Sequence, residues 1–269
     1  MNVVNESRAR AHRVQVRFYQ ELGDFLAPQR RGREFEVAVN DGTTTKALVE
    51  HCGVPHGEVD LLLVDGESVD FACKLRDGQR VSVYPVFESF DISALTRVRP
   101  APLRVVRFLV DANLAKLASL LRMCGLDATD ASMLCRTACG AEDEDARLVT
   151  AALREQRIIL TRDRRLLERK AVTHGCFVRS QDPEQQLLFV LRRFDLAAAV
   201  RPFSRCMRCN EPLEPVAKAD VLQRLPPMVR VEQQTFSRCP RCDRLYWPGS
   251  HWQRMRRRLD ALLATHRPG

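Results

Sequence analysis

The stretch Val105–Gly125, VVRFLVDANLAKLASLLRMCG, decides the fold of the central part of the chain. Its first six residues are mostly apolar and predict a buried strand, which ends at Asp111. Leucines then recur near a period of 3.6 residues, which predicts a helix that stops at Gly125. A strand that leads directly into a helix is the repeating unit of a parallel α/β sheet.

The same alternation continues down the chain. Acidic residues open the next helix, and IILTRDRRLL (158–167) begins as an apolar strand and turns polar at Thr161. Asp182 and Pro183 are typical of an N-cap and a first helical position. The pattern therefore predicts an α/β domain with a mainly parallel sheet. Its expected elements are a helix at 142–156, a strand at 157–161, a helix at 163–172, a strand at 175–179 and a helix at 182–194.

The first third of the chain has a different pattern. Two segments alternate apolar and polar residues, 14–19 and 33–39, and predict half-buried strands. A short helix follows within 41–55, and Asp65-Gly66 and Asp77-Gly78 predict hairpin turns. This is a compact α+β unit. The whole chain is expected to divide into a flexible N-terminus (1–13), this unit (14–92), a linker rich in Pro and Arg (93–103), the α/β domain (104–200), a cysteine-bearing module (201–252) and a basic helical tail (253–269).

Two C-x-x-C motifs mark the C-terminal module, Cys206/Cys209 and Cys239/Cys242. Two tight turns that each supply two thiolates are typical of a structural zinc site with four cysteine ligands. The segment between the motifs has room for two or three short strands of a zinc ribbon. A redox dithiol pair or two disulfides are the alternatives. The other six cysteines are expected to pack as small apolar side chains, although Cys135 and Cys139 also have a spacing that can bind metal: Cys52, Cys73, Cys124, Cys135, Cys139 and Cys176.

Acidic residues follow the predicted strands or open the predicted helices of the α/β domain. Asp111 and Asp163 each follow a strand, and Asp143, Glu144 and Asp145 begin a helix. Ligands of open parallel sheets bind at the edge where strands end and helices begin. Carboxylates gathered there repel one another unless a hard cation such as Mg²⁺ or Mn²⁺ is bound. The alternative is that each acid is a helix cap.

Positive charge is concentrated at the C-terminal end. Of the net +9, residues 201–269 contribute +8, from 14 basic and six acidic side chains. Such a module favours a polyanion partner, most simply RNA, although a solvated basic surface is the alternative. Around the second C-x-x-C motif (each motif is called a knuckle below), arginines would hold phosphates and aromatic rings would stack on bases. Those rings could instead form the module's core. Arginines near Asp163 would also hold phosphates. The candidates are Arg162, Arg164, Arg165, Arg241, Arg244, Trp247 and Trp252.

The sequence also predicts a compartment. It contains no apolar run of the length that a membrane span needs, and its start, MNVVNESRARAHR, has no apolar signal-peptide core. The expected location is the cytoplasm, where thiols stay reduced, without contact with a membrane.

The first unit resembles the ubiquitin-like β-grasp family, especially its sulfur-carrier branch, through DGTTTKALVEHCGVPHGEVDLLLVDGESV and DGQRVSVYPVF. Sulfur carriers act through a free C-terminal Gly-Gly. Here the chain continues through ESFDISALTRVRPAP without that dipeptide. The resemblance therefore implies a docking role toward a protein partner, a regulatory role or a structural appendage rather than carrier chemistry.

Residues 104–255 resemble the Mut-seven C-terminal RNase domain family, through FLVDANLAKLASLLRMCGLDA, EDEDARLVTAALREQRIILTRDRRLL, DPEQQLLFVLRRF, SRCMRCNEPL and CPRCDRLYWPGSHWQRM. The resemblance implies a PIN-like nuclease fold with an appended zinc ribbon, and a metal-dependent ribonuclease activity. It assigns Asp111, Asp145 and Asp163 to a catalytic Mg²⁺ or Mn²⁺ site, with Asp143 as the competitor of Asp145. For a fourth acid, Asp130 and Asp182 are the candidates. A catalytically silent RNA-binding adaptor that recruits a protein partner is the alternative function.

Overall fold

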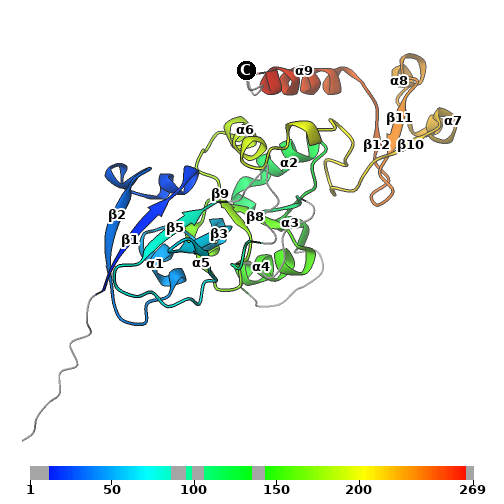
Figure 1. Ribbon diagram of the computed structural model, residues 1–269. Helices are drawn as coiled ribbons and strands as arrows, with labels where there is room; N and C mark the ends of the chain where they lie inside the picture. Colours follow the sequence, from blue (N-terminus) through cyan, green and yellow to red (C-terminus); the bar gives the residue numbers. More distant parts are fainter. Residues whose placement is uncertain (1–11, 86–94, 99–105, 135–142, 265–269) are drawn as a thin grey trace, which may run out of the picture. The chain divides into compact units, whose positions relative to one another are not determined.

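The computed structural model describes residues 12–85, 95–98, 106–134 and 143–264 (Figure 1). The fold is mixed α/β, as the sequence predicts. Contacts divide the chain into two compact units. The first contains the N-terminal part up to Arg104 together with the segment Asp163–Phe177. The second contains Val105–Arg162 and Val178–Gly269.

The first unit contains a five-stranded sheet in the order β2-β1-β5-β3-β4. The first and last long strands, β1 and β5, are parallel neighbours, and the other pairs are antiparallel, which is the β-grasp arrangement that the sequence predicts. The elements are β1 (His12–Phe18), η1 (Gln20–Phe25), η2 (Pro28–Arg30), β2 (Glu34–Val39), α1 (Thr45–His51), η3 (His56–Glu58), β3 (Leu61–Val64), β4 (Glu67–Ser68), β5 (Arg80–Tyr84), α5 (Arg164–Glu168) and β9 (Gly175–Phe177).

Alternation of side chains builds the core of this sheet. Val14 and Val16 of β1 are fully buried, whereas Gln15 between them is partly exposed. The predicted helix is α1, and the hydroxyl of Thr44 caps it by accepting a hydrogen bond from the Ala47 amide at 3.2 Å. The predicted turn between β3 and β4 has positive φ at Asp65 (51°) and at Gly66 (88°), as a two-residue hairpin turn requires.

Two buried polar side chains of η3 contact the segment Asp163–Phe177. Glu58 is 2% exposed, and its carboxylate accepts a hydrogen bond from the backbone amide of Phe177. His56 is 4% exposed; its Nδ1 lies 2.8 Å from Glu50, and its Nε2 lies 3.1 Å from the carbonyl oxygen of Val172. Because buried polar groups are costly without partners, these bonds fix the segment against η3.

The second unit is built on parallel strands in the order β7-β6-β8. The three residues of β6 are fully buried, and α2 packs against α6. The sequence predicted β6, β8 and the helices α2, α4 and α6, but it did not predict the three-residue strand β7. The elements are β6 (Phe108–Val110), η4 (Ala112–Leu114), α2 (Ala115–Met123), β7 (Ala128–Asp130), α3 (Ala131–Leu134), α4 (Glu144–Glu155), β8 (Ile158–Thr161), α6 (Pro183–Arg193) and η5 (Ala197–Ala199).

The cysteine-bearing module belongs to the second unit and has a three-stranded antiparallel sheet, β10-β11-β12. Short helices lie between β10 and β11, where the sequence predicted only strands, and Val221, Leu225 and Phe236 form a small core there. Pro226 and Pro227 start the last of these helices, a position that proline favours. The elements are β10 (Glu214–Val216), α7 (Lys218–Val221), η6 (Leu222–Arg224), α8 (Pro227–Glu232), β11 (Phe236–Arg238), β12 (Leu245–Tyr246) and α9 (Ser250–Ala264).

Replacing Glu58 tests the packing of η3 against the segment Asp163–Phe177. Glu58→Ala should lower the free energy of unfolding by about 1–3 kcal/mol, because the Phe177 amide loses its acceptor in a buried place. Glu58→Gln keeps an acceptor oxygen and should cost less. Urea denaturation followed by circular dichroism measures both. Glu67→Ala, at an exposed position of β4, is the control and should change stability by less than about 0.5 kcal/mol; equal losses in all three variants would contradict the assignment.

Candidate functional site

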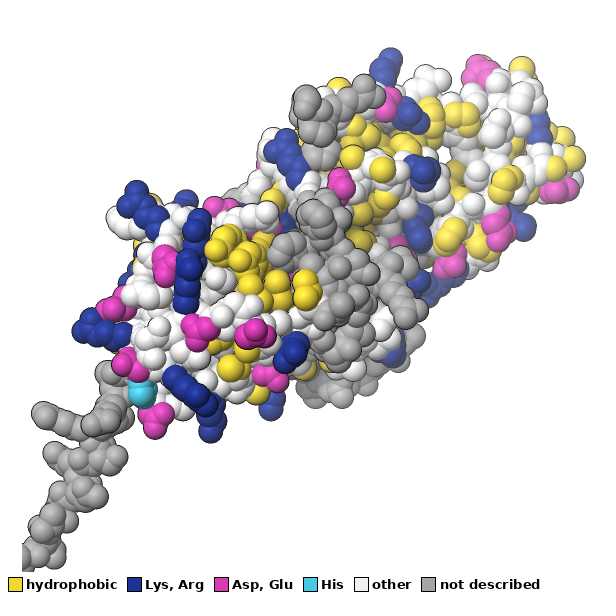
Figure 2. Space-filling model, in the orientation of Figure 1, with side chains coloured by type: hydrophobic (Ala, Val, Ile, Leu, Met, Phe, Trp, Pro, Cys, Tyr) yellow, Lys and Arg dark blue, Asp and Glu magenta, His cyan; other side chains and the backbone are white. Residues whose placement is uncertain are grey.

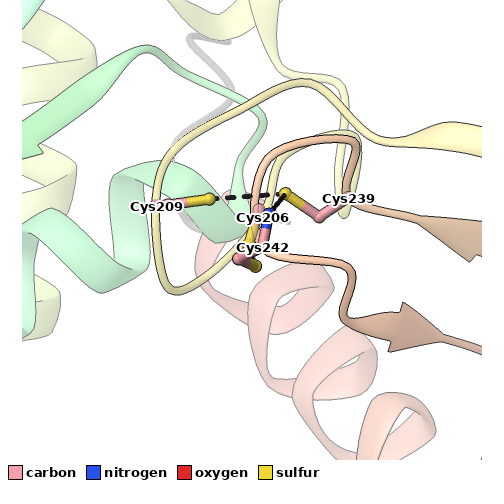
Figure 3. Close-up of side chains that lie close together, drawn as sticks. All are labelled: Cys206, Cys209, Cys239 and Cys242. Atoms are coloured by element: carbon pink, nitrogen blue, oxygen red, sulfur yellow. Dashed lines mark hydrogen bonds between the residues drawn. The ribbon is translucent and has the colours of Figure 1, made fainter.

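The four cysteines of the C-x-x-C motifs lie together in the second unit (Figure 3). Their sulfur atoms all lie within 4.8 Å of one another. The Sγ atoms of Cys206 and Cys242 are 3.5 Å apart, and those of Cys209 and Cys239 are 3.3 Å apart. These distances exclude disulfides in this structure and approach the roughly 3.8 Å that separates thiolates bound tetrahedrally to one zinc ion at 2.3 Å. The residues present therefore fit zinc.

Both knuckles use the same backbone turn. The residue after the second cysteine has positive φ, 65° at Asn210 and 56° at Asp243. Its amide donates to the carbonyl of the first cysteine, at 2.9 Å in each case. Asn and Asp tolerate this left-handed conformation better than most residues, so the motif is in effect C-x-x-C-[Asn/Asp]. The sequence carried this signal, and our prediction did not use it.

Tyr246 adds a hydrogen bond to the cysteine group. Its hydroxyl lies 3.1 Å from the sulfur of Cys206 and accepts from the Met207 amide at 3.2 Å. Burial opposes ionisation of Cys206, but the bonds from Tyr246 and from knuckle amides lower the pKa of this thiol to about 6. Zinc binds thiolates, so this environment assists metal binding.

The other described cysteines pack as predicted. Cys124 and Cys176 are fully buried, and Cys52 and Cys73 are partly buried. Burial raises the pKa of Cys124 to about 12, and that of Cys52 to about 11 despite the nearby Arg30. These two thiols are therefore protonated at neutral pH. Cys135 and Cys139 lie outside the described residues.

Asp111 stands directly after β6, as predicted. Its backbone amide donates to the carbonyl of Leu160 in β8 at 2.9 Å. Its carboxylate accepts from the Thr161 hydroxyl at 2.6 Å and from the Asn113 side chain at 2.8 Å. Although Asp111 precedes the short helix η4, its side chain makes no cap hydrogen bond there. Helix capping therefore does not explain this carboxylate.

The acids at the start of α4 divide their roles. Asp143 is the N-cap, because its carboxylate accepts from the amide of Asp145 at 3.2 Å. Asp145 itself lies in the first helical turn and is partly buried. Capping thus accounts for Asp143 and leaves Asp145 as the better candidate ligand of the two. Among the described residues, the cysteine group is the one cluster of three or more potential ligands, and Asp111 and Asp145 are not part of such a cluster.

Three further aspartates have structural partners. Asp163 is exposed and caps α5 by accepting from the Arg165 amide at 2.8 Å. Asp182 caps α6, as predicted, with bonds from the amides of Glu184 and Gln185 at 3.1 and 2.9 Å. Asp130 ends β7 in a buried ion pair with Arg122. Burial opposes ionisation of Asp130, but bonds from Ser132 and Arg122 outweigh it and lower the pKa. Neither candidate for a fourth acid is thus free of a structural explanation.

Comparison with known families agrees with this architecture. The Mut7-C RNAse domain model matches residues 106–259, and the Mut7-C ubiquitin model matches residues 11–91. The chain belongs to the Mut7-C RNAse domain family. No match was found among curated proteins.

The Mut7-C ubiquitin region and the segment that begins at Asp163 share one unit, and Arg164 takes part in their packing. Its guanidinium donates to the carbonyl of Gly53 and lies 5.3 Å from the centre of the Phe25 ring. These contacts give Arg164 a structural role. Arg162 and Arg165 are exposed, so their predicted RNA contacts stay predictions.

The tryptophans of the Mut7-C RNAse region are partly buried and pack against other side chains of the second unit. Trp247 is partly buried against the core of Val221, Leu225 and Phe236. The ring of Trp252 lies 4.9 Å from that of Phe203. These contacts favour the alternative in which the rings complete the module's core. Arg241 and Arg244 are exposed. On the face drawn in Figure 2, basic side chains are scattered among acidic and apolar ones, so charge alone does not mark an RNA site on that face.

One structural finding bears on membranes. Among the described residues of this Mut7-C RNAse protein, no helix is long and apolar enough to cross a lipid bilayer.

Removing one thiolate tests the zinc site. Purified protein should contain one zinc ion per chain, and Cys239→Ser should lose most of it, because a serine hydroxyl is a poor zinc ligand. The melting temperature should also fall, since zinc binding supplies folding free energy to such a small module. Elemental analysis and thermal denaturation measure the two effects. Cys73→Ser, outside the cysteine group, should keep its zinc; loss of zinc in both variants or in neither would contradict the assignment.

Proposed function

We propose that this chain is a metal-dependent ribonuclease that hydrolyses RNA phosphodiester bonds. Membership of the Mut7-C RNAse domain family supports a nuclease. The observation that carries the proposal is the carboxylate of Asp111, which helix capping does not explain. Thr161 holds it by a hydrogen bond at the end of β8, two residues before Asp163 in the sequence.

The proposed acids stand at the ends of strands and the start of a helix, where parallel sheets bind ligands. Asp111, Asp145 and Asp163 would hold the metal ion, because carboxylate oxygens are the ligands that Mg²⁺ and Mn²⁺ prefer. Asp163 also caps α5, and one carboxylate can both cap a helix and bind a metal ion. A bound ion of this kind supplies an activated water and neutralises charge on the phosphate. Asp111 accepts two hydrogen bonds, from Thr161 and Asn113, which fix the direction of its carboxylate.

Arg162 and Arg165 flank Asp163 and are exposed, so both can reach a phosphate of the RNA backbone. Arginine suits this role, because its planar guanidinium donates two parallel hydrogen bonds to phosphate oxygens. We call the proposed group of Asp111, Asp145 and Asp163 the acidic site. The cysteine-bearing module and α9 together carry most of the excess positive charge and would bind the RNA chain outside it. The ubiquitin-like part would dock a protein partner, and the expected place of action is the cytoplasm.

Replacing Asp163 tests the activity. Asn caps helices about as well as Asp, so Asp163→Asn should keep α5 intact while it removes the negative charge. We expect manganese-dependent cleavage of labelled RNA to fall by a factor on the order of 10² or more. Asp182→Asn makes the same exchange at the cap of α6 and should leave cleavage unchanged.

Manganese titration by calorimetry separates this function from the alternative. The ribonuclease should bind Mn²⁺ in addition to zinc, and Asp163→Asn should bind it more weakly. If the wild-type protein binds no Mn²⁺, and neither it nor Asp163→Asn cleaves RNA, the chain is a silent RNA-binding adaptor instead.

A further inference from the structure

A cavity of about 500 Å³ in the second unit is not part of the acidic site. One wall is the edge of the sheet where β6, β7 and β8 begin, which is opposite to the edge where Asp111 follows β6. The other wall is the first cysteine knuckle, with Arg241 from the second knuckle. Five arginines line the cavity: Arg107, Arg154, Arg157, Arg205 and Arg241.

Strand pairing brings the charges of the first wall together. Arg107, Asp127 and Arg157 each stand one residue before a strand, and the first residues of these three strands are paired in register. Arg157 donates to Asp127 at 2.6 Å and to the carbonyl of Phe108 at 3.2 Å. Parallel pairing thus collects one acid and two arginines at the edge that the acidic site does not use.

The knuckle is fixed to this edge through Asn210. Its amide group donates to Asp127 at 2.7 Å, and its side-chain oxygen accepts from the Ala128 amide at 3.0 Å. Arg205 lies 3.6 Å from the same carboxylate. Asn210 is 6% exposed, so this contact is buried. Hydrogen bonds and an ion pair therefore join the two walls.

Charge in the cavity stays positive despite its acids. Its lining includes three acidic residues, Asp127, Glu155 and Glu211, against the five arginines. Burial opposes ionisation of Asp127, but bonds from Arg157 and Asn210 and the charge of Arg205 outweigh it and lower its pKa. The carboxylate of Asp127 is thus ionised and is bound to Arg157 and Asn210, with Arg205 nearby.

The arginines fall into two groups by exposure. The side chains of Arg157 and Arg205 are only 10% and 22% exposed and are held by acids and carbonyl groups. Those of Arg107 and Arg154 are 47% and 71% exposed, and Arg241 is also exposed. Arg107 lies 4.0 Å from Asp127, and Arg154 pairs with Glu155 at 2.8 Å. The inner pair is held in place inside the cavity. Exposed ion pairs contribute little free energy, so Arg107 and Arg154 can exchange theirs for a phosphate.

We propose that this cavity binds the phosphodiester backbone of the RNA chain, at a site separate from the acidic site. Guanidinium groups recognise phosphate by paired hydrogen bonds, and several in one cavity suit a polyanion better than a lone phosphate. A three-residue strand such as β6 spans about 10 Å. One RNA strand can therefore reach both edges of the sheet over a few nucleotides. The proposal rests on RNA being the substrate of the proposed function.

Binding of a labelled, single-stranded oligouridylate to the full-length, zinc-loaded protein tests the proposal without any cleavage step. The variant Arg154→Gln/Arg241→Gln removes two exposed arginines from the cavity. We expect it to bind about 10-fold or more weakly, with the slope of log affinity against log salt reduced by about 1–2, as the loss of two phosphate contacts requires. Fluorescence anisotropy at several salt concentrations measures both quantities.

The matched control is Arg33→Gln/Arg76→Gln, which removes the same charge from exposed positions of the first unit. It should change affinity less than 2-fold. Equal weakening in both double variants would mean that only net charge matters and would overturn the proposal. Unchanged binding by the cavity variant, or no RNA binding by the wild-type protein, would also overturn the proposal. The arginines would then serve only to connect the sheet edge to the first knuckle through ion pairs.

Two further arms separate this site from others. Uridine monophosphate should compete at least about 100-fold more weakly than the oligonucleotide, because it offers one phosphate instead of a chain; equal competition would assign the cavity to free nucleotides and overturn the proposal. If the cavity variant loses binding while RNA is never cleaved, the ribonuclease function fails and the binding site stands.

Discussion

Parallel pairing of β6 with β7 and β8 is the constraint on which the second unit depends. It buries the three apolar residues of β6 completely, so the polar residues next to β6 stand where that strand begins or ends. At the end of β6, Asp111 meets Thr161 of β8. At the beginnings, Arg157 meets Asp127. The short apolar strands thus separate two edges of the sheet. One edge carries Asp111, an aspartate that caps no helix, and arginines line the other.

The cysteine group adds a second constraint. Its first knuckle both supplies two sulfur ligands and contacts the sheet edge, because Asn210 follows Cys209 directly and bonds to Asp127 and Ala128. Any ion held by the four cysteines therefore also stabilises one wall of the arginine cavity. This coupling explains why a module that is small in itself can present a defined surface.

Most of the fold could be predicted from the sequence, because the signals are local. Periodic apolar residues indicated the strands and helices, and paired C-x-x-C motifs indicated the cysteine group. The strand β7 was missed because three residues, Ala128–Asp130, show no periodicity. The functions of single side chains were harder to predict. Asp111 and Asp163 both follow strands and precede helical turns in the sequence, and only the contacts show that Asp163 caps a helix whereas Asp111 does not. The arginine cavity was invisible because its members are distant in sequence and meet only through strand register and the knuckle.

The ubiquitin-like part shows why sequence likeness and physical contact divide a chain differently. By sequence, the segment Asp163–Phe177 lies within the match to the Mut7-C RNAse domain, at residues 106–259. By contacts, it belongs with the ubiquitin-like part. Buried Glu58 and His56 bond to its backbone, and a buried carboxylate that loses its partner is costly.

A freely attached docking module would leave this surface open to an outside partner. Here the chain's own segment already contacts η3, so a protein partner would have to bind elsewhere on the ubiquitin-like part. The segment begins at Asp163, whose helix α5 contacts η3. The ubiquitin-like part therefore packs against the helix that follows Asp163, a proposed metal ligand. Its contacts give it this structural role, whether or not it also binds a protein partner.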